Sequence, residues 1–131
     1  MRFDHAGIAT DDAASLAGLY ADLLDCAVVH EERFDGMDVV FLDLGNGYFE
    51  LLEPHGGGAV ADYIAERGPG IHHLAVRVED GDGGIEGAME RARERGVELV
   101  DEEPREGAWG HRVAFCHPAS TGGVLLEFVE H

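Results

Sequence analysis

The sequence predicts an α+β fold made of two βαβββ modules related by a pseudo-twofold axis, with curved mixed sheets that enclose a cavity. Two observations predict this fold. The order of one strand, one helix and three strands occurs once in each half of the chain, and only a short, partly helical connector joins the halves. We expect one domain over residues 1–131, with modules at about residues 1–54 and 70–131 and the connector at about 55–69.

In the first module, two aspartates at residues 11 and 12 precede leucines that recur at helical spacing, which is typical of a capped amphipathic helix. A Gly-Asn-Gly turn then separates two apolar runs, as in a hairpin. The helix carries on its apolar face Leu16, Leu19, Tyr20, Leu23 and Leu24. The expected strands are "FDHAGIA" (3–9), "AVVHEERF" (27–34), "DVVFLDL" (38–44) and "YFELLEP" (48–54).

The pattern repeats after a connector helix, "AVADYIAER" (59–67), and a Gly-Pro-Gly turn. Asp82 is placed to cap the second module's helix. This helix carries on its apolar face Ile85, Met89 and Ala92. The expected strands are "IHHLAVRV" (71–78), "GVELVDEEP" (96–104), "HRVAFCHP" (111–118) and "GGVLLEFVEH" (122–131).

The charge of the chain restricts its partners. Nine arginines, no lysine and 27 acidic residues give a formal net charge of −18. So acidic a surface repels nucleic acid and anionic membranes, and neither is expected as a partner. At about 1 M salt the Debye length falls to about 3 Å, which screens most of the repulsion within the chain. We therefore expect a protein of a halophilic cytoplasm; the alternative is an ordinary acidic bacterial protein.

The sequence also favours a cytoplasmic location. No stretch approaches the about 18 apolar residues of a membrane span. The N-terminus, "MRFDHAGIATDD", is acidic where a signal peptide would be apolar. Cys26 and Cys116 match no zinc-binding spacing, so we expect reduced, half-buried thiols.

Aligning the two modules brings four polar residues into equivalent places. "HAGIA" lies over "HLAVR", which matches His5 with His73, and "FELLEP" lies over "LEFVEH", which matches Glu50 with Glu127. Each glutamate interrupts an apolar strand, where an unpaired carboxylate is costly to bury. Two imidazoles and two carboxylates can hold a divalent cation with positions open for substrate, so we expect the cavity to bind a metal. The alternatives are hydrogen-bonded core histidines and a glutamate out of register.

The adjacent histidines in "GIHHLAV" are expected to differ, because neighbouring side chains of a strand point to opposite faces. His72 matches Asp4 of the other module and is expected to point away from the metal, toward packing or solvent. The remaining histidines have no equivalent partners and are expected to be surface or structural residues: His30, His55, His111, His117 and His131.

Four segments carry a resemblance to a known family: "ELLEP", "RGPGIHHLAVRV", "GVELVDEEPREGAWGHRVAFCHP" and "STGGVLLEFVE". Over nearly its whole length the chain resembles the methylmalonyl-CoA epimerase family of the vicinal-oxygen-chelate (glyoxalase/bleomycin resistance) superfamily. The resemblance implies a homodimeric, metal-dependent isomerase of propionate metabolism that acts on methylmalonyl-CoA. It implies a divalent cation, with cobalt or manganese favoured over zinc, nickel or magnesium. The implied ligands are His5, Glu50, His73 and Glu127.

The implied reaction interconverts (R)- and (S)-methylmalonyl-CoA by removing the α-proton and returning one to the other face of a metal-stabilised enolate. Glu127 is the expected acid–base residue on one face. Several members carry a second catalytic glutamate where this chain has Val39, which cannot carry a proton. Glu50 is therefore the favoured second acid–base residue, and the alternative is an unplaced group or water.

Two other functions stay open. A glyoxalase I-type lactoylglutathione lyase would use the same four ligands, although "HPASTGG" stands where glyoxalases have an Asp-Pro-Asp-Gly-like turn. A metal-free small-molecule binding protein of the same superfamily would generally lack the four ligands. Arg105 and Arg112 are candidates for binding coenzyme A phosphates, or are paired with some of the 27 acids.

Overall fold

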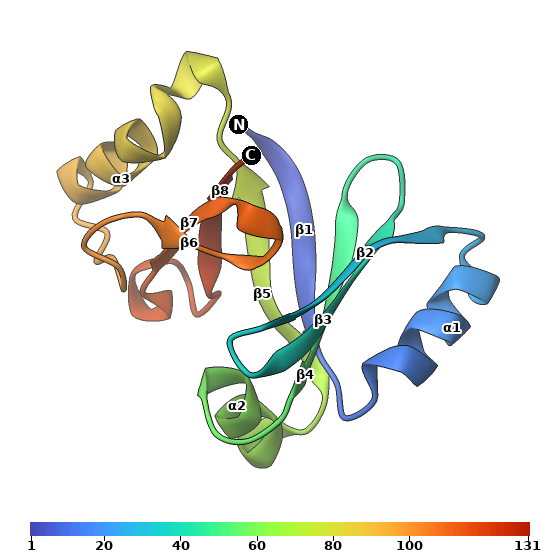
Figure 1. Cartoon of the computed structure of the whole chain (residues 1–131). Coiled ribbons are helices and arrows are strands. Elements are labelled where there is room, and N and C mark those ends of the chain that lie inside the picture. The colour runs from blue at the N-terminus through green and yellow to red at the C-terminus, as the bar shows by residue number, and fades with distance from the viewer. The chain divides into compact units, whose positions relative to one another are not determined.

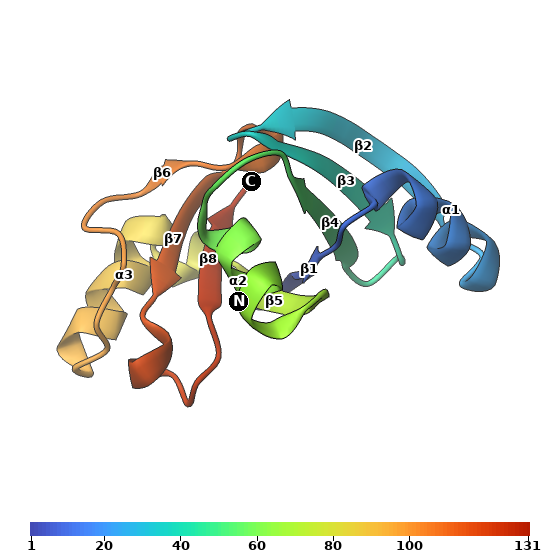
Figure 2. The same ribbon diagram turned by 90° about the horizontal axis from the view of Figure 1, so that it is seen from below.

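The computed structural model describes all 131 residues of the chain. They form two compact units: the first unit is His5–His72, and the second unit is Met1–Asp4 together with His73–His131. Figures 1 and 2 show the ribbon from two directions. Each unit repeats one strand, one helix and three strands, so the predicted α+β class of two βαβββ modules is confirmed. That the modules make one domain stays a prediction.

The first unit is a mixed sheet with the strand order β2-β3-β4-β1, in which β1 runs parallel to β4 and the other neighbours are antiparallel. Its elements are β1 (Arg2–Ala9), α1 (Ala13–Leu23), β2 (Ala27–Phe34), β3 (Met37–Asp43), β4 (Tyr48–Pro54) and α2 (Ala59–Arg67). The helix α1 packs on Val40, Leu42 and Leu51 of the sheet. Its predicted cap is present, because Asp12 Oδ1 accepts a hydrogen bond from Ser15 N at 3.0 Å.

The hairpin between β2 and β3 decides which side chains share a face of this sheet. Asp35 and Gly36 form the turn with φ angles of 49° and 73°, the left-handed conformations that a two-residue hairpin turn requires. From this turn the strands pair regularly until a β-bulge between Val28 and His30. A bulge adds one residue to one strand, so the alternation of that strand's side chains between the two faces is reversed beyond the bulge.

The second unit has the strand order β5-β8-β7-β6, with β5 parallel to β8 and the other neighbours antiparallel. Its elements are β5 (Gly70–Arg77), the 3-10 turn η1 (Asp80–Asp82), α3 (Gly84–Glu94), β6 (Arg105–Glu106), η2 (Ala108–Gly110), β7 (Arg112–Cys116), η3 (Pro118–Ser120) and β8 (Leu126–Glu130). The predicted apolar face of α3, with Ile85, Met89 and Ala92, packs on Ala114 and Phe128 of β7 and β8.

Two local predictions for the second unit were wrong. The expected strand at 96–104 is reduced to a single bridge at Leu99, and regular pairing with β7 begins only at β6. The reason is that the Asp101 carboxylate accepts the hydrogen bond from Phe115 N at 2.8 Å, which takes the place of a ladder bond. The helix cap falls at Gly83, because the Asp82 carboxylate accepts instead from Glu79 N at 2.9 Å.

None of the helices has the length and apolar character needed to cross a lipid bilayer. Both cysteines are unpaired, as predicted; Cys116 is buried and Cys26 is half-buried. Burial raises the pKa of the Cys116 thiol. A thiol held in its neutral form is a poor nucleophile, so Cys116 serves packing.

Candidate functional site

Each unit holds one buried histidine–glutamate pair, which we call its half-site. In the first unit, His5 Nε2 on β1 lies 3.2 Å from Glu50 Oε1 on β4, and the side chains are only 5% and 7% exposed. The parallel ladder places Gly7 beside Glu50, so His5 lies two residues earlier on the same face. Phe41 on β3 directly opposes Glu50, and its ring meets the His5 ring at right angles, 5.9 Å away.

The half-site of the second unit is built in the same way. His73 Nε2 on β5 lies 3.7 Å from Glu127 Oε1 on β8, again with side chains 5% and 7% exposed. Ala75 is the residue beside Glu127, so the histidine again precedes the paired position by two residues. Phe115 on β7 opposes Glu127, and its ring lies 5.5 Å from the His73 ring, edge to face. The predicted equivalence of the four residues thus extends to their ladder positions and their aromatic neighbours.

The donor atoms of the half-sites suit a divalent cation. Imidazole nitrogen and carboxylate oxygen together are ligands that cobalt, manganese, zinc and nickel accept. A buried carboxylate is costly unless a cation or several hydrogen bonds compensate it. Both glutamates are buried, and each has an imidazole nitrogen close to one of its oxygens. The side chains of each half-site therefore fit half of a metal-binding set.

The structure separates the two adjacent histidines of β5 by environment. His73 lies in the half-site with Glu127. His72 is half-buried, and its ring meets the Tyr63 ring of α2 edge to face at 5.3 Å. Tyr63 Oη in turn donates a hydrogen bond to Ile71 O at 2.7 Å. His72 therefore packs on the connector helix.

Next to the first half-site, the edge strand β2 adds two polar residues that were not predicted to be site residues; one of them, His30, was expected to be a surface or structural residue. His30 opposes Phe41 and Glu32 opposes Val39, and directly opposite residues of antiparallel strands share a face. His30 Nε2 lies 3.2 Å from Glu32 Oε1, and the His30 ring lies 6.1 Å from that of Phe41. No sequence signal could have selected these residues, because the bulge at the start of β2 decides which side chains share this face.

The equivalent place in the second unit is occupied by a cation. Arg105 on β6 opposes Val113, as Glu32 opposes Val39 in the first unit. Its guanidinium lies over the Phe115 ring at 5.4 Å, and Asp101 Oδ1 accepts a hydrogen bond from its Nε at 2.9 Å. Because Asp101 is in contact with Nε alone, the guanidinium keeps further donors beside the half-site.

The other arginine considered in the sequence, Arg112, is committed to structure. Its guanidinium donates hydrogen bonds to Glu86 and to Glu130, the latter at 2.6 Å. These bonds, the one to Glu86 first, raise the pKa of Arg112, and they lower the pKa of Glu86. Arg112 therefore ties α3 to the end of β8.

A second cluster of potential ligands lies in the first unit, where His55 Nε2 is 2.8 Å from Asp38 Oδ2 and 3.0 Å from Glu53 Oε2. The hydrogen bond from His55, helped by Arg33, lowers the pKa of Asp38. The second oxygen of Glu53 accepts from Ala13 N at 2.8 Å, at the start of α1. These contacts give each side chain a structural task at the ends of β3, β4 and α1.

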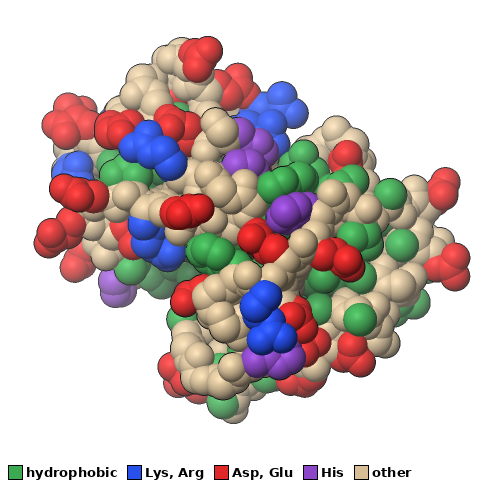
Figure 3. Space-filling view, in the orientation of Figure 1, with side chains coloured by type: hydrophobic (Ala, Val, Ile, Leu, Met, Phe, Trp, Pro, Cys, Tyr) green, Lys and Arg blue, Asp and Glu red, His purple; other side chains and the backbone are tan.

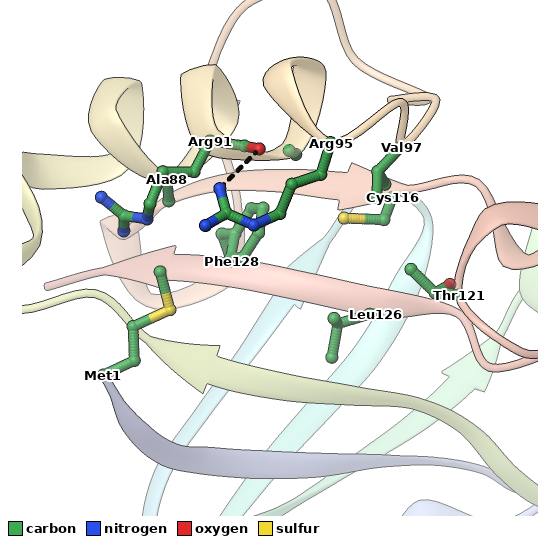
Figure 4. A pocket seen from close by; sticks show the side chains of 10 residues that line it. Met1, Ala88, Arg91, Arg95, Val97, Cys116, Thr121, Leu126 and Phe128 are labelled. Atoms are coloured by element: carbon green, nitrogen blue, oxygen red, sulfur yellow. Dashed lines mark hydrogen bonds between the residues drawn. The ribbon is translucent and has the colours of Figure 1, made fainter.

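A pocket of about 370 Å³ lies between α3 and the strands of the second unit (Figure 4). Leu126 and Phe128 line it, whereas Glu127 between them points to the opposite face of β8. Arg91 and Arg95 stand at α3, joined by a hydrogen bond from Arg95 Nη1 to Arg91 O at 3.4 Å. This pocket therefore belongs to the helix-covered face and not to the half-site.

Charge is unevenly divided between the units. Carboxylates are spread over the visible surface, and arginines are few (Figure 3). Seven of the nine arginines belong to the second unit, and only Arg33 and Arg67 belong to the first. Both units are still net negative, at −7 in the second (seven arginines and 14 acidic residues) and −11 in the first (two arginines and 13 acidic residues), so an anionic ligand is repelled less by the second unit.

Comparison with known proteins gives a family for this arrangement. Residues 4–115 match the family model of the Glyoxalase/Bleomycin resistance protein/Dioxygenase superfamily. The ethylmalonyl-CoA/methylmalonyl-CoA epimerase of Cereibacter sphaeroides is 36% identical over 131 residues, which cover 96% of this chain and 95% of the relative.

Solved structures agree with this family. The crystal structure of methylmalonyl-CoA epimerase from Mycobacterium tuberculosis superposes with a TM-score of 0.90 at 36% identity, covering 98% of this chain and 87% of that one. A variant of the Streptomyces coelicolor methylmalonyl-CoA epimerase in complex with 2-nitronate-propionyl-CoA gives a TM-score of 0.88 at 34% identity, covering 99% and 96%.

Proposed function

Because the chain belongs to the glyoxalase/bleomycin resistance protein/dioxygenase superfamily and matches methylmalonyl-CoA epimerases over nearly its whole length, we propose that it epimerises methylmalonyl-CoA. The observation that carries this proposal is the duplicated half-site, one buried imidazole and one buried carboxylate in each unit. Epimerisation removes a proton from one face of a carbon and returns one to the other, so acid–base groups are needed on both faces. A duplicated set of carboxylates suits that requirement.

We propose that the two half-sites hold one divalent cation. The ligands would be His5, Glu50, His73 and Glu127. A cation bound there supplies Lewis acidity at the thioester oxygen, where negative charge develops when the α-proton leaves. Cobalt and manganese are the favoured ions, and zinc, nickel and magnesium are the alternatives that metal analysis of the purified protein would separate.

The chain's own residues move the proton. Glu127 is the proposed acid–base residue on one face, and its Oε1 lies 3.7 Å from His73 Nε2. Phe115 opposes it and keeps water from one side of the carboxylate. On the other face, Glu50 is the carboxylate that the sequence favours. Glu50, like Glu127, would then have two tasks, metal binding and proton transfer.

Arg105 is the proposed contact for the anionic part of coenzyme A. The substrate carries several negative charges and meets a chain of net charge −18, so a cation beside the site is needed to offset the repulsion. Arg105 stands on the Phe115 ring, next to the His73 half-site. Arg112 is unsuited to this task, because Glu86 and Glu130 already compensate its charge.

A homodimer is proposed for the assembled enzyme. Exposed apolar side chains gather in the first unit at the end of α1 and on the edge strand β2. They are Leu19, Leu23, Leu24, Val28 and Val29. An exposed edge strand flanked by apolar residues is a natural place for a second copy to pair. Sedimentation of the wild type and of Leu23→Glu would test this, since the variant is expected to be monomeric.

The acidic surface is proposed to be an adaptation to a salt-rich cytoplasm. Raising the concentration of KCl from near zero to about 1 M shortens the Debye length from beyond 30 Å to about 3 Å and should raise the melting temperature steadily. An unchanged melting temperature across this range would contradict the proposal.

One assay tests the proposed activity. The protein is incubated with (S)-methylmalonyl-CoA in D2O, with and without chelator, and the two epimers are separated. We expect (R)-methylmalonyl-CoA labelled with deuterium at the α-carbon, loss of turnover with chelator, and recovery with cobalt or manganese. Turnover of a glutathione hemithioacetal instead would identify a glyoxalase I-type lyase. No turnover and no bound metal would identify a binding protein, and either result would overturn the proposal.

A further inference from the structure

We propose that Glu32, which lies beside His30, is the proton-transfer carboxylate of the first unit, which leaves Glu50 to the metal. This inference rests on the proposed epimerase function. Glu32 opposes Val39 on the ladder between β2 and β3, and His30 opposes Phe41. Phe41 in turn opposes Glu50 on the other side of β3. Glu32 therefore projects from the sheet face that carries the half-site, and not from the face covered by α1.

The β-bulge at the start of β2 makes this placement possible. Before the bulge, Val28 opposes Leu42, which packs in the core beneath α1. After it, His30 and Glu32 oppose residues of the other face. A strand without the extra residue would turn these two side chains toward α1. Bulges beside active sites commonly redirect a side chain in this way.

The surroundings of Glu32 suit a group that gains and loses a proton in every cycle. His30 Nε2 lies 3.2 Å from Glu32 Oε1, close enough to act electrostatically on the carboxylate, although the two atoms do not form a hydrogen bond in this structure. The Glu32 side chain is 28% exposed, which lets its proton exchange with water between turnovers. Glu50 also has an imidazole nitrogen at 3.2 Å, that of the predicted ligand His5, but its side chain is only 7% exposed.

The second unit shows why the first unit must supply this group. At the position equivalent to Glu32 it has Arg105, which cannot accept a proton. Its only carboxylate on the half-site is Glu127, the proposed acid–base residue of one face. The opposite face then needs a carboxylate from the first unit, and the more exposed of the two carboxylates on that face, Glu32, is the one we assign.

The proposed step is balanced without any co-reactant. The Glu32 carboxylate takes the α-proton of one epimer, and the electrons of the broken C–H bond form the carbon–carbon double bond of the enolate. The carboxylic acid of Glu127 then gives its proton to the opposite face of the same carbon. Water returns each glutamate to its starting protonation state, and the reverse reaction exchanges the two roles.

The test is solvent exchange by the metal-loaded Glu32→Gln enzyme, with Glu31→Gln as the matched control. Glu31 is the exposed neighbour on the opposite face of β2, and the substitution changes the charge equally. Each pure epimer is incubated in D2O and followed by NMR. In Glu32→Gln we expect epimerisation to fall at least about 100-fold, because a positioned acid–base group contributes about 10²–10⁴-fold. The epimer deprotonated by Glu127 should still acquire deuterium with its configuration retained.

The outcomes separate this inference from the proposed function. A wild-type enzyme that epimerises nothing would refute the function itself. A Glu32→Gln enzyme that epimerises as fast as wild type and Glu31→Gln would refute the role of Glu32 alone. Loss of exchange from both epimers, with unchanged metal content and melting temperature, would also refute it, because a single proton-transfer residue serves only one epimer.

Discussion

The two units contain the same half-site but surround it differently. In both, a histidine lies two residues before the position beside a glutamate, and a phenylalanine opposes that glutamate. On the next strand of each sheet, β2 in the first unit and β6 in the second, the residues at equivalent positions differ. The first unit has Glu32 with His30, and the second has Arg105 with Asp101. We call the half-site residues the inner layer and the residues on β2 and β6 the outer layer. The inner layer is duplicated and the outer layer differs between the units, which indicates that the two layers have separate tasks.

The chemistry of a 2-carboxyacyl thioester explains such a division. The proposed metal would take its ligands from one symmetric set, the inner residues, which keep the same ladder positions in both units. The substrate itself is asymmetric, with a small reacting carbon at one end and a large polyanion at the other. An acid–base pair on one unit and a cation on the other match these two ends. Substitutions at equivalent positions of the two units test this division of tasks.

The largest effect is expected from the inner layer. Loss of an outer-shell partner costs about 10–100-fold in metal affinity, and loss of a ligand should exceed this. His5→Ala and His73→Ala should therefore each lower the affinity for cobalt by more than about 100-fold, measured by calorimetry. His72→Ala should bind metal as the wild type does, because His72 packs on Tyr63. A large difference between His5→Ala and His73→Ala would show that the half-sites are not equivalent.

A second comparison concerns Asp4 and His72, the equivalent positions one residue before each half-site histidine. Asp4 is 1% exposed and accepts from Arg77 Nε at 2.8 Å, with His131 Nε2 at 2.6 Å. Removing one partner of a buried ion pair costs about 3–5 kcal/mol. Because Arg77 is partly exposed, we expect the free energy of unfolding of Asp4→Ala to fall by about 3 kcal/mol, measured with urea.

The control for this stability effect is His72→Ala. An edge-to-face aromatic contact contributes about 0.5–1.5 kcal/mol, so this variant should lose no more than that. Equal losses in the two variants would mean that the buried Asp4–Arg77 pair adds nothing beyond local packing. In that case the outward positions of the two units would be energetically alike.

The inner layer could be read from the sequence, and the outer layer could not. His5, Glu50, His73 and Glu127 were predicted because the repeat duplicates their positions and because each glutamate interrupts an apolar strand. Period-two alternation assigns a face within one strand, but it fails across a bulge. The bulge near Val28 is a feature of pairing between strands, and no local pattern in "AVVHEERF" marks it.

Arg105 was named from the sequence, but its place was not. "GVELVDEEP" reads as a strand by its apolar residues, and the structure keeps only one bridge of it because Asp101 replaces a ladder bond. Regular pairing then starts at Arg105, which sets its guanidinium over Phe115. A side chain that substitutes for a backbone hydrogen bond can be recognised only when its partner strand is known.

The outer layer of the second unit is tested by its effect on binding. A hydrogen bond to a charged group contributes about 1.5–3 kcal/mol, so Arg105→Ala should raise KM for methylmalonyl-CoA by about tenfold or more with little change in kcat. Arg105→Lys should recover part of the loss, because the positive charge is kept. Arg33→Ala, an exposed arginine of the first unit, serves as the control. An unchanged KM in Arg105→Ala would contradict the proposal that Arg105 of the second unit binds the anionic part of the substrate.

The smallest effect is expected for the Asp38–His55 pair of the first unit, which lies away from the half-site. The hydrogen bond from His55, together with Arg33, lowers the pKa of Asp38 in the folded protein. A carboxyl with a lowered pKa in the folded state stabilises the protein above its unfolded pKa, about 3.9, and loses this contribution as pH falls through the lower folded value. Asp38→Asn should therefore be slightly less stable than wild type at pH 6, and the difference should be smaller at pH 3. Urea unfolding at both pH values measures it, and a difference that grows on acidification would show that Asp38 is stabilised in its protonated form.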